Sequence, residues 1–130
     1  MIPSPLSQRQ DWSPPELLLE AAADDDTLII KLIDAFSTDT GARIDTMRQA
    51  LAGSDFTRIR AEAHTIKGSA SQMGADALAE ACRELEMAAN LHDARLISPW
   101  LTRIQGLFDD MRGAMSVYAG GGNGEPLVTP

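Results

Sequence analysis

The part of this sequence best suited to chemistry lies between residues 63 and 74. A neutral imidazole nitrogen, such as that of His64, is a competent nucleophile near pH 7. An N–P product on the ring would carry negative charge, which Lys67, one helical turn further on, is placed to balance. Gly68 costs about 1 kcal/mol relative to alanine inside a helix, and we interpret it as a gap through which another protein reaches the ring. Together these residues predict a histidine that accepts a phosphoryl group.

Each of these residues also has an ordinary interpretation. A lone histidine at the edge of the buried face of a helix is usually an ordinary surface residue. Lysines such as Lys67 are common on exposed helix faces, and a glycine in a helix often allows close packing between helices. Arg60, one turn before His64, and Ser71, two turns after it, lie on the same helix face and are further candidates for partner contact. The joint occurrence of Lys67 and Gly68 beside the histidine favours the functional interpretation.

Four stretches of the chain repeat apolar residues every three or four positions, which predicts four amphipathic helices. Their apolar positions are 29, 33, 36, 44, 47 and 51; then 56, 59, 63, 66, 70 and 73; then 78, 82, 85 and 89; and last 97, 101, 104, 108, 111, 115 and 118. No segment alternates as a strand does. Narrow seams and short connections predict an all-α fold, an antiparallel up-down-up-down four-helix bundle.

The helix ends follow from local residue types. Ser13 with prolines after it and Glu16 resembles a capping box, which predicts a short extra N-terminal helix over 14–22. The acidic run 24–26 is interpreted as the cap of the next helix, since the helix dipole favours negative charge there, and no EF-hand spacing follows it. We expect that long helix to be interrupted at Thr40 and Gly41.

Two later caps and the domain limits are predicted in the same way. Ser54 is placed to cap the helix that carries the histidine, and Ser98 to cap the last helix, with Pro99 at its first position. Proline-rich residues 1–13 and glycine-rich residues 119–130 are predicted to be flexible segments. One domain, 14–118, lies between them.

Composition narrows the possible partners. The chain has 130 residues, a length typical of a single domain, and its net charge is −8. This acidity argues against binding to nucleic acid and to anionic membrane surfaces. No apolar run is long enough for a membrane span and no signal peptide is recognisable, so direct membrane insertion is not expected. The single cysteine, Cys82, can form no internal disulfide, which fits a cytoplasmic protein.

A residue opposite the histidine can be inferred from hairpin geometry. If helices 54–73 and 76–92 turn near residue 75, His64 lies eleven residues before the turn and Glu86 eleven after it. We predict that Glu86 accepts a hydrogen bond from one ring nitrogen and leaves the other exposed. The alternative is a solvated glutamate on an exposed edge. Arg83, one turn before Glu86, is a weaker candidate for the same face.

The run His-Thr-Ile-Lys-Gly-Ser-Ala at residues 64–70, followed by Met-Gly at 73–74, closely resembles the signature of histidine-containing phosphotransfer (HPt) domains. The family pattern is His-x-aliphatic-Lys-Gly-small-small, with a glycine ending the helix a few residues later. The resemblance extends over about residues 25–118. Family members often carry glutamine where this chain has Glu86, so the carboxylate is a departure.

The resemblance implies a function. His64 would be the phosphoacceptor, Lys67 would stabilise the phosphoryl group and Gly68 would keep the surface open to receiver domains. The chain would carry phosphoryl groups between receiver aspartates in a multistep two-component phosphorelay, as a monomer. Response-regulator receiver domains, and a hybrid sensor histidine kinase, would be its partners, whether the domain stands alone or belongs to such a kinase.

Enzyme chemistry of its own is not expected. The chain has no phosphate-binding glycine loop and no recognisable nucleotide site, so it is described as a phosphocarrier. It would need no cofactor, and Mg²⁺ would sit in the partner receiver domain.

A helical bundle has two rival functions. The first is an interaction-only helical bundle, a scaffold that keeps the fold without phosphate chemistry. The second is a diiron bundle, which needs Glu-x-x-His on two helices. Ala61 and Ala89 stand three residues before His64 and His92, so the second rival fails on spacing and no metal site is expected.

Overall fold

A computed structural model describes residues 12–121 of the chain. Every regular element within that range is a helix: α2 (Glu16–Ala21), α3 (Asp26–Ala52), α4 (Phe56–Gln72), α5 (Asp76–Asn90) and α6 (Ala94–Gly121). Helix α2 is short, and the other four are long enough to form a bundle. The expected all-α fold with a short extra N-terminal helix is therefore confirmed.

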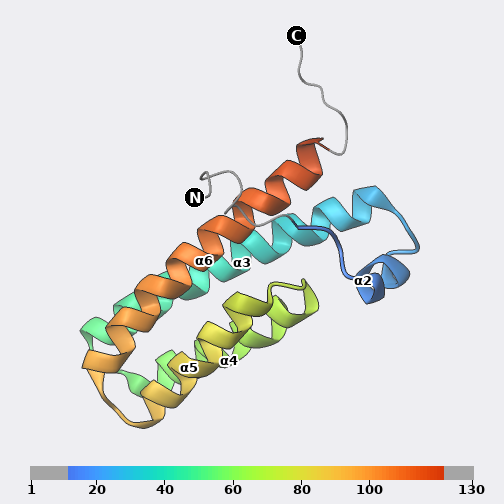
Figure 1. Ribbon diagram of the computed structural model, residues 1–130. Helices are drawn as coiled ribbons and strands as arrows, with labels where there is room; N and C mark the ends of the chain where they lie inside the picture. Colours follow the sequence, from blue (N-terminus) through green and yellow to red (C-terminus); the bar gives the residue numbers. More distant parts are fainter. Residues whose placement is uncertain (1–11, 122–130) are drawn as a thin grey trace, which may run out of the picture.

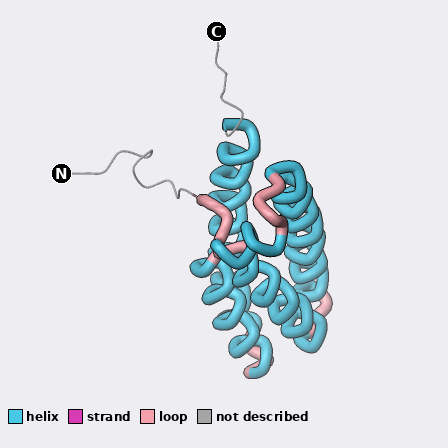
Figure 2. The backbone as a smooth tube through the Cα atoms, turned by 90° about the vertical axis from the view of Figure 1, so that its right-hand side faces the viewer, coloured by secondary structure: helices cyan, strands magenta, loops and turns pink. Residues whose placement is uncertain are grey.

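The four long helices close into a ring of neighbours. Helix α3 packs against α4 and α6, and α5 packs against α4 and α6. Figure 1 shows α6 lying along α3 and α5 lying along α4, and Figure 2 shows the four helices running side by side with short loops at their ends. Helices α3 and α6 span about 40 Å each and extend past the shorter α4–α5 hairpin. This is the predicted antiparallel up-down-up-down bundle.

The core is built from the predicted apolar seams. Most seam residues are fully buried, among them Ile29, Ile66 and Phe108, while Leu51, Phe56 and Tyr118 are half-buried at the ends of their stripes. Burial of this kind contributes about 25 cal/mol per Å² of apolar surface removed from water. One core therefore holds all four long helices together.

The helix caps differ partly from the sequence prediction. The acidic run does cap α3, because the Asp25 carboxylate accepts hydrogen bonds from the backbone N–H of Thr27 (2.9 Å) and Leu28 (3.4 Å). The capping box at Ser13 is wrong: α2 begins at Glu16 after an extended Pro15, and no side chain caps it. The physical reason is that a proline forces the residue before it out of the helical region, so the helix cannot start earlier.

The predicted serine caps of α4 and α6 are also wrong. Ser54 has a positive φ of 55° and belongs to the turn that ends α3, so Asp55 caps α4 by accepting from the N–H of Arg58 at 3.0 Å. Helix α6 begins five residues before Pro99, which lies inside it. Asp93 caps this helix, because its carboxylate accepts from the N–H of Arg95 at 3.0 Å.

The expected interruption of the long helix at Thr40 and Gly41 is absent, and α3 is continuous. Thr40 is fully buried and Gly41 lies beside α6, where a Cβ would stand 3.7 Å from the Phe108 ring. Packing against neighbouring helices outweighs the low helix propensity of these two residues.

The N-terminal end of the domain reaches further than predicted. Trp12 is buried, its indole N–H donates to the carbonyl of Met73 at 2.7 Å, and its ring meets Tyr118 edge-on at 5.3 Å. Residue 12 therefore does not belong to a flexible segment; long-range contacts with α6 and the end of α4 hold it. Helix α6 likewise continues to Gly121, beyond the expected limit at 118. Residues 1–11 and 122–130 lie outside the described range, so the flexibility expected for them stays a prediction.

Candidate functional site

The α4–α5 hairpin sets the register of the site. Helix α4 ends where the N–H of Ala75 donates to the carbonyl of Ala70 at 2.8 Å, and Gly74 adopts a φ of +73° between the two helices. A Cβ on Gly74 would also stand 2.8 Å from the ring of Pro15, so a side chain there would clash as well as strain the backbone. This tight turn brings equidistant residues of α4 and α5 to the same level.

His64 of α4 and Glu86 of α5 meet at that level. The Nδ1 atom of His64 lies 2.9 Å from one Glu86 carboxylate oxygen, Oε2, which is a hydrogen bond. The other oxygen, Oε1, forms an ion pair with the Lys67 ammonium at 2.7 Å. The contact between ring and carboxylate is the one that the hairpin geometry predicted. With Nδ1 occupied as donor, the neutral ring presents Nε2 as its nucleophilic nitrogen.

The three side chains differ in exposure. The side chain of His64 is 68% exposed, that of Lys67 is 31% exposed and that of Glu86 is 17% exposed. Burial would raise the pKa of Glu86, but the hydrogen bonds from Lys67 and His64 outweigh it and lower the pKa below its usual value. Glu86 is therefore a carboxylate at neutral pH, seated under an exposed imidazole.

Behind this group lies Cys82. Its thiol is buried, and burial followed by the nearby Glu86 charge raises its pKa to about 12. It is a neutral thiol at physiological pH and adds no charge to the site.

The surface around His64 on α4 has low relief. Gly68 is exposed, and apart from its chain neighbours and the adjacent backbone of its own helix, no atom lies within 4 Å of the position a Cβ would take. Close helix packing, the ordinary interpretation of this glycine, is therefore wrong. The hydroxyls of Thr65 and Ser69 donate to backbone carbonyls of their own helix, at 3.2 Å in each case. A partner approaching His64 from this side meets little side-chain bulk.

The remaining candidates stand at the edges of this surface. Arg60 and Ser71 are exposed on α4, at the spacings that place them on the histidine face. Arg83 is half-exposed on α5, but its guanidinium is paired with Glu80 at 2.6 Å and with Glu84 at 3.4 Å. None of the three contacts His64 in this structure, so their roles toward a partner stay predictions.

Sequence reasoning missed one buried charge near the site. Glu62, two residues before His64, is 7% exposed and receives 2.8 Å hydrogen bonds from Arg43 of α3 and Arg58 of α4. The spacing of Arg58 and Glu62 was visible as an i,i+4 pair, but the third partner comes from another helix. This group joins α3 to α4 on the side of α4 that faces away from α5.

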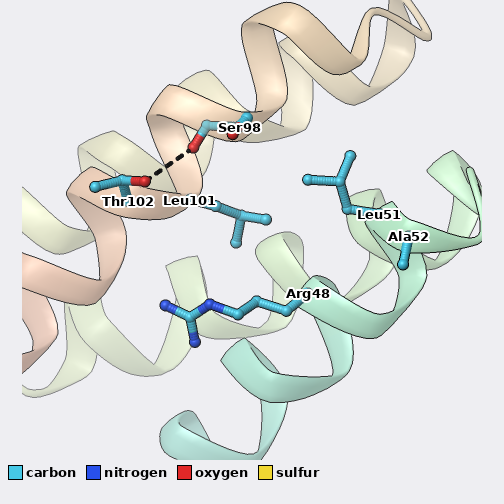
Figure 3. A pocket seen from close by; sticks show the side chains of 6 residues that line it. All are labelled: Arg48, Leu51, Ala52, Ser98, Leu101 and Thr102. Atoms are coloured by element: carbon cyan, nitrogen blue, oxygen red, sulfur yellow. Dashed lines mark hydrogen bonds between the residues drawn. The ribbon is translucent and has the colours of Figure 1, made fainter.

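Other kinds of site are not indicated. Within residues 12–121, no group of three or more His, Cys, Asp or Glu side chains is placed to hold a metal ion. None of the helices in that range is long and apolar enough to cross a membrane. A surface pocket lies between the end of α3 and the start of α6, where Arg48, Leu51 and Leu101 line it (Figure 3). It takes no residue from α4 or α5, so it is separate from His64.

Comparison with known proteins agrees with this geometry. The family profile described as the Hpt domain matches residues 31–114, more than half of the chain. A solved structure, the histidine-containing phosphotransfer protein B (HptB) of Pseudomonas aeruginosa PAO1, is similar with a TM-score of 0.73 and 25% sequence identity. The alignment covers 82% of this chain and 93% of that one. No curated protein sequence matches significantly.

The matched residues contain the His64–Lys67–Gly68 motif, and the shared fold is the same helical bundle. One finding rests on sequence and the other on three-dimensional shape. This protein belongs to the Hpt domain family, whose function is histidine phosphotransfer in phosphorelays.

Proposed function

We propose that His64 takes up a phosphoryl group from the aspartyl phosphate of one receiver domain and passes it to the aspartate of another. The observation that carries this proposal is the geometry of the ring: Nδ1 is held by Glu86 at 2.9 Å while the side chain stays 68% exposed. Among the described residues, Nε2 has no hydrogen-bond partner. It is therefore free to attack phosphorus.

The transfer itself needs little from this chain beyond position and charge. Nε2 attacks the phosphorus of the aspartyl phosphate, an N–P bond forms, and the P–O bond breaks with its electron pair going to the receiver aspartate. The Lys67 ammonium is ion-paired with Glu86 at 2.7 Å and has N–H donors to offer to phosphoryl oxygens. Transfer onward is the same displacement in reverse, on a second receiver.

The chain is proposed to act as a carrier rather than an enzyme. It has no nucleotide-binding motif, so the phosphoryl group has to come from a partner, either a receiver domain alone or one in a hybrid sensor histidine kinase. The proposal assigns Mg²⁺ to the acidic site of the receiver and no cofactor to this chain. The proposal takes the protein to be a cytoplasmic monomer, and the free thiol of Cys82 fits that compartment.

The test uses the second histidine as a built-in control. The chain has two histidines, and His92 lies in the α5–α6 turn, stacked on Phe56 with ring centroids 5.1 Å apart. Incubation with a ³²P-labelled receiver and Mg²⁺ should give an acid-labile label on the parent protein and on His92→Gln. His64→Gln should take up none, because Nε2 is the acceptor.

The opposite result has a clear meaning. If His64→Gln takes up as much label as the parent protein, His64 is not the acceptor and the proposal fails. If none of the variants takes up label from any receiver in a panel, an interaction-only bundle becomes the better description. Circular dichroism of each variant checks that the helices are intact.

A further inference from the structure

Glu86 is a carboxylate in a position where an uncharged acceptor would satisfy the same hydrogen bond. One oxygen accepts from Nδ1 of His64 at 2.9 Å, and the other meets the Lys67 ammonium at 2.7 Å. An amide could also accept from Nδ1, but it would add no negative charge beneath the ring. The negative charge of Glu86 therefore indicates a role beyond orienting the imidazole.

Charged side chains of both α4 and α5 border the His64 ring. On α4 these are Arg60, one turn before His64, and Lys67, one turn after it. On α5 they are Glu86 itself and Arg83, whose guanidinium is held by Glu80 and Glu84 at the outer edge. Buried Cys82 is a neutral thiol. Among the described residues, Glu86 is thus the one carboxylate that contacts the ring.

We propose that Glu86 keeps the proton on Nδ1 while Nε2 carries the phosphoryl group, and so sets the pH range in which that group can leave. Glu86 acts here as a positioning residue, since it touches the imidazole and not the phosphorus. The inference rests on the proposed function of His64 as the acceptor.

The chemistry of the leaving group gives the reason. When an acceptor oxygen attacks phosphorus, the N–P bond breaks and its electron pair returns to Nε2. If Nδ1 holds a proton, the leaving group is a neutral imidazole. If Nδ1 has lost it, the leaving group is an imidazolate, which is far more basic and leaves far more slowly. Retention of the Nδ1 proton therefore decides whether phospho-His64 is competent to transfer.

A carboxylate favours retention more than an amide does. Phosphorylation at Nε2 of a ring protonated at Nδ1 gives the ring positive charge, and Glu86 lies within hydrogen-bond distance of that charge. An opposite charge at this distance stabilises the charged form, in the way the buried aspartate of a catalytic triad stabilises imidazolium. The lowered pKa of Glu86 keeps it ionised to support this role. With glutamine, the proton would be lost at a lower pH.

The experiment measures phosphate loss from the phosphorylated protein across pH. Phosphoramidate, a small-molecule donor, phosphorylates the full chain without a receiver, and release of inorganic phosphate to water is followed between pH 5 and pH 9. At pH 5 the parent protein and Glu86→Gln should release phosphate at similar rates, since both rings are protonated. At pH 8, Glu86→Gln should release phosphate more slowly than the parent protein, by up to about tenfold for each pH unit by which the adjacent charge shifts loss of the Nδ1 proton.

Glu84→Gln is the matched control, because it removes the same charge two residues away, from a side chain paired with Arg83 instead of His64. Its pH profile should overlay that of the parent protein. ¹⁵N NMR of the phosphorylated ring gives a second readout, with a larger fraction of Nδ1 protonated at pH 8 in the parent protein than in Glu86→Gln.

Two results overturn the inference. Coinciding pH profiles for the parent protein and Glu86→Gln show that the carboxylate does not hold the proton. An equal shift in Glu84→Gln shows only a general effect of net charge. Failure of the underlying function looks different: the parent protein would then take up no more phosphate than His64→Gln, before any pH profile is recorded.

Discussion

Gly68 occupies a helical position where alanine would fit. Apart from its chain neighbours and the adjacent backbone of its own helix, no atom lies within 4 Å of its missing Cβ, and the neighbouring hydroxyls of Thr65 and Ser69 donate back to their own helix. Inside the domain this glycine therefore only costs helix stability. We attribute it to a requirement from outside, which is the approach of a receiver to the ring of His64.

This assignment predicts opposite effects of one substitution on stability and on transfer. Gly68→Ala should raise the free energy of unfolding by about 0.5–1 kcal/mol, since alanine is the better helix former. The same methyl group should slow phosphoryl transfer from a receiver, because it occupies the docking surface, and Gly68→Gln should slow it further. Urea unfolding and initial transfer rates measure the two effects.

Gly106 of α6 provides the comparison. It is exposed, and its Cβ position is equally open, but α6 does not carry the site. Gly106→Ala should give a similar gain in stability and leave transfer unchanged. Transfer at the parental rate in Gly68→Ala and Gly68→Gln would mean that the open surface has no part in docking.

At the scale of elements, the position of α4 depends on an ion cluster around the buried carboxylate of Glu62 as well as on apolar packing. Glu62 of α4 is held by Arg43 of α3 and Arg58 of α4 at 2.8 Å each. Arg43 donates hydrogen bonds to Asp39 and to Glu62, and these bonds, that to Asp39 first, raise the pKa of Arg43, so this guanidinium stays charged. The cluster ties α3 to the helix that presents His64, on the side away from the ring.

Removal of the shared carboxylate should loosen this junction. Glu62→Ala is expected to lower the free energy of unfolding by about 2 kcal/mol, because it leaves Arg43 and Arg58 without their common partner. Asp109→Ala, which removes an exposed partner of Arg112, should have a much smaller effect. Urea unfolding measures both, and equal losses in the two variants would contradict a special role for the cluster.

The helices also show which features of the structure could be predicted from sequence patterns. Seams such as Ile59–Ala63–Ile66 predicted the helices, and counting from a turn near residue 75 predicted that Glu86 would face His64, because both depend on local periodicity. Trp12 and Glu62 were missed since their partners come from distant parts of the chain. The sequence pattern predicted that α6 starts at Pro99, because proline favours the first position of a helix. In the structure α6 starts at Ala94, and its packing in the bundle tolerates Pro99 inside the helix.

At the scale of the whole molecule, stability is linked to pH through the carboxylates. The pKa values of Glu80, Glu86 and Asp93 are lowered in the folded protein; Glu80 and Asp93 are hydrogen-bonded to arginines, and for Glu86 the bonds from Lys67 and His64 outweigh burial. A group whose folded pKa lies below its unfolded value stabilises the protein above the unfolded pKa. This contribution is lost as the pH falls through the folded pKa.

The chain should therefore lose stability between about pH 5 and pH 3, because the unfolded state binds more protons in that window. Glu86→Gln removes one of the contributing groups, so the difference in unfolding free energy between pH 7 and pH 3.5 should be smaller than in the parent protein. Urea unfolding at the two pH values measures it. An undiminished difference in Glu86→Gln would show that the ion pair with Lys67 adds nothing to folding.

The two tryptophans of the chain stand at opposite ends of the bundle. Trp12 is buried against Tyr118 and the carbonyl of Met73, near the α4–α5 turn, while Trp100 is half-buried at the start of α6. Each is a natural fluorophore for its own end. In Trp12→Phe only Trp100 fluoresces, and in Trp100→Phe only Trp12 does, so each variant reports on one end of the bundle without an added label. Coinciding unfolding curves of the two variants in the same denaturant titration would show that both ends unfold as one cooperative unit.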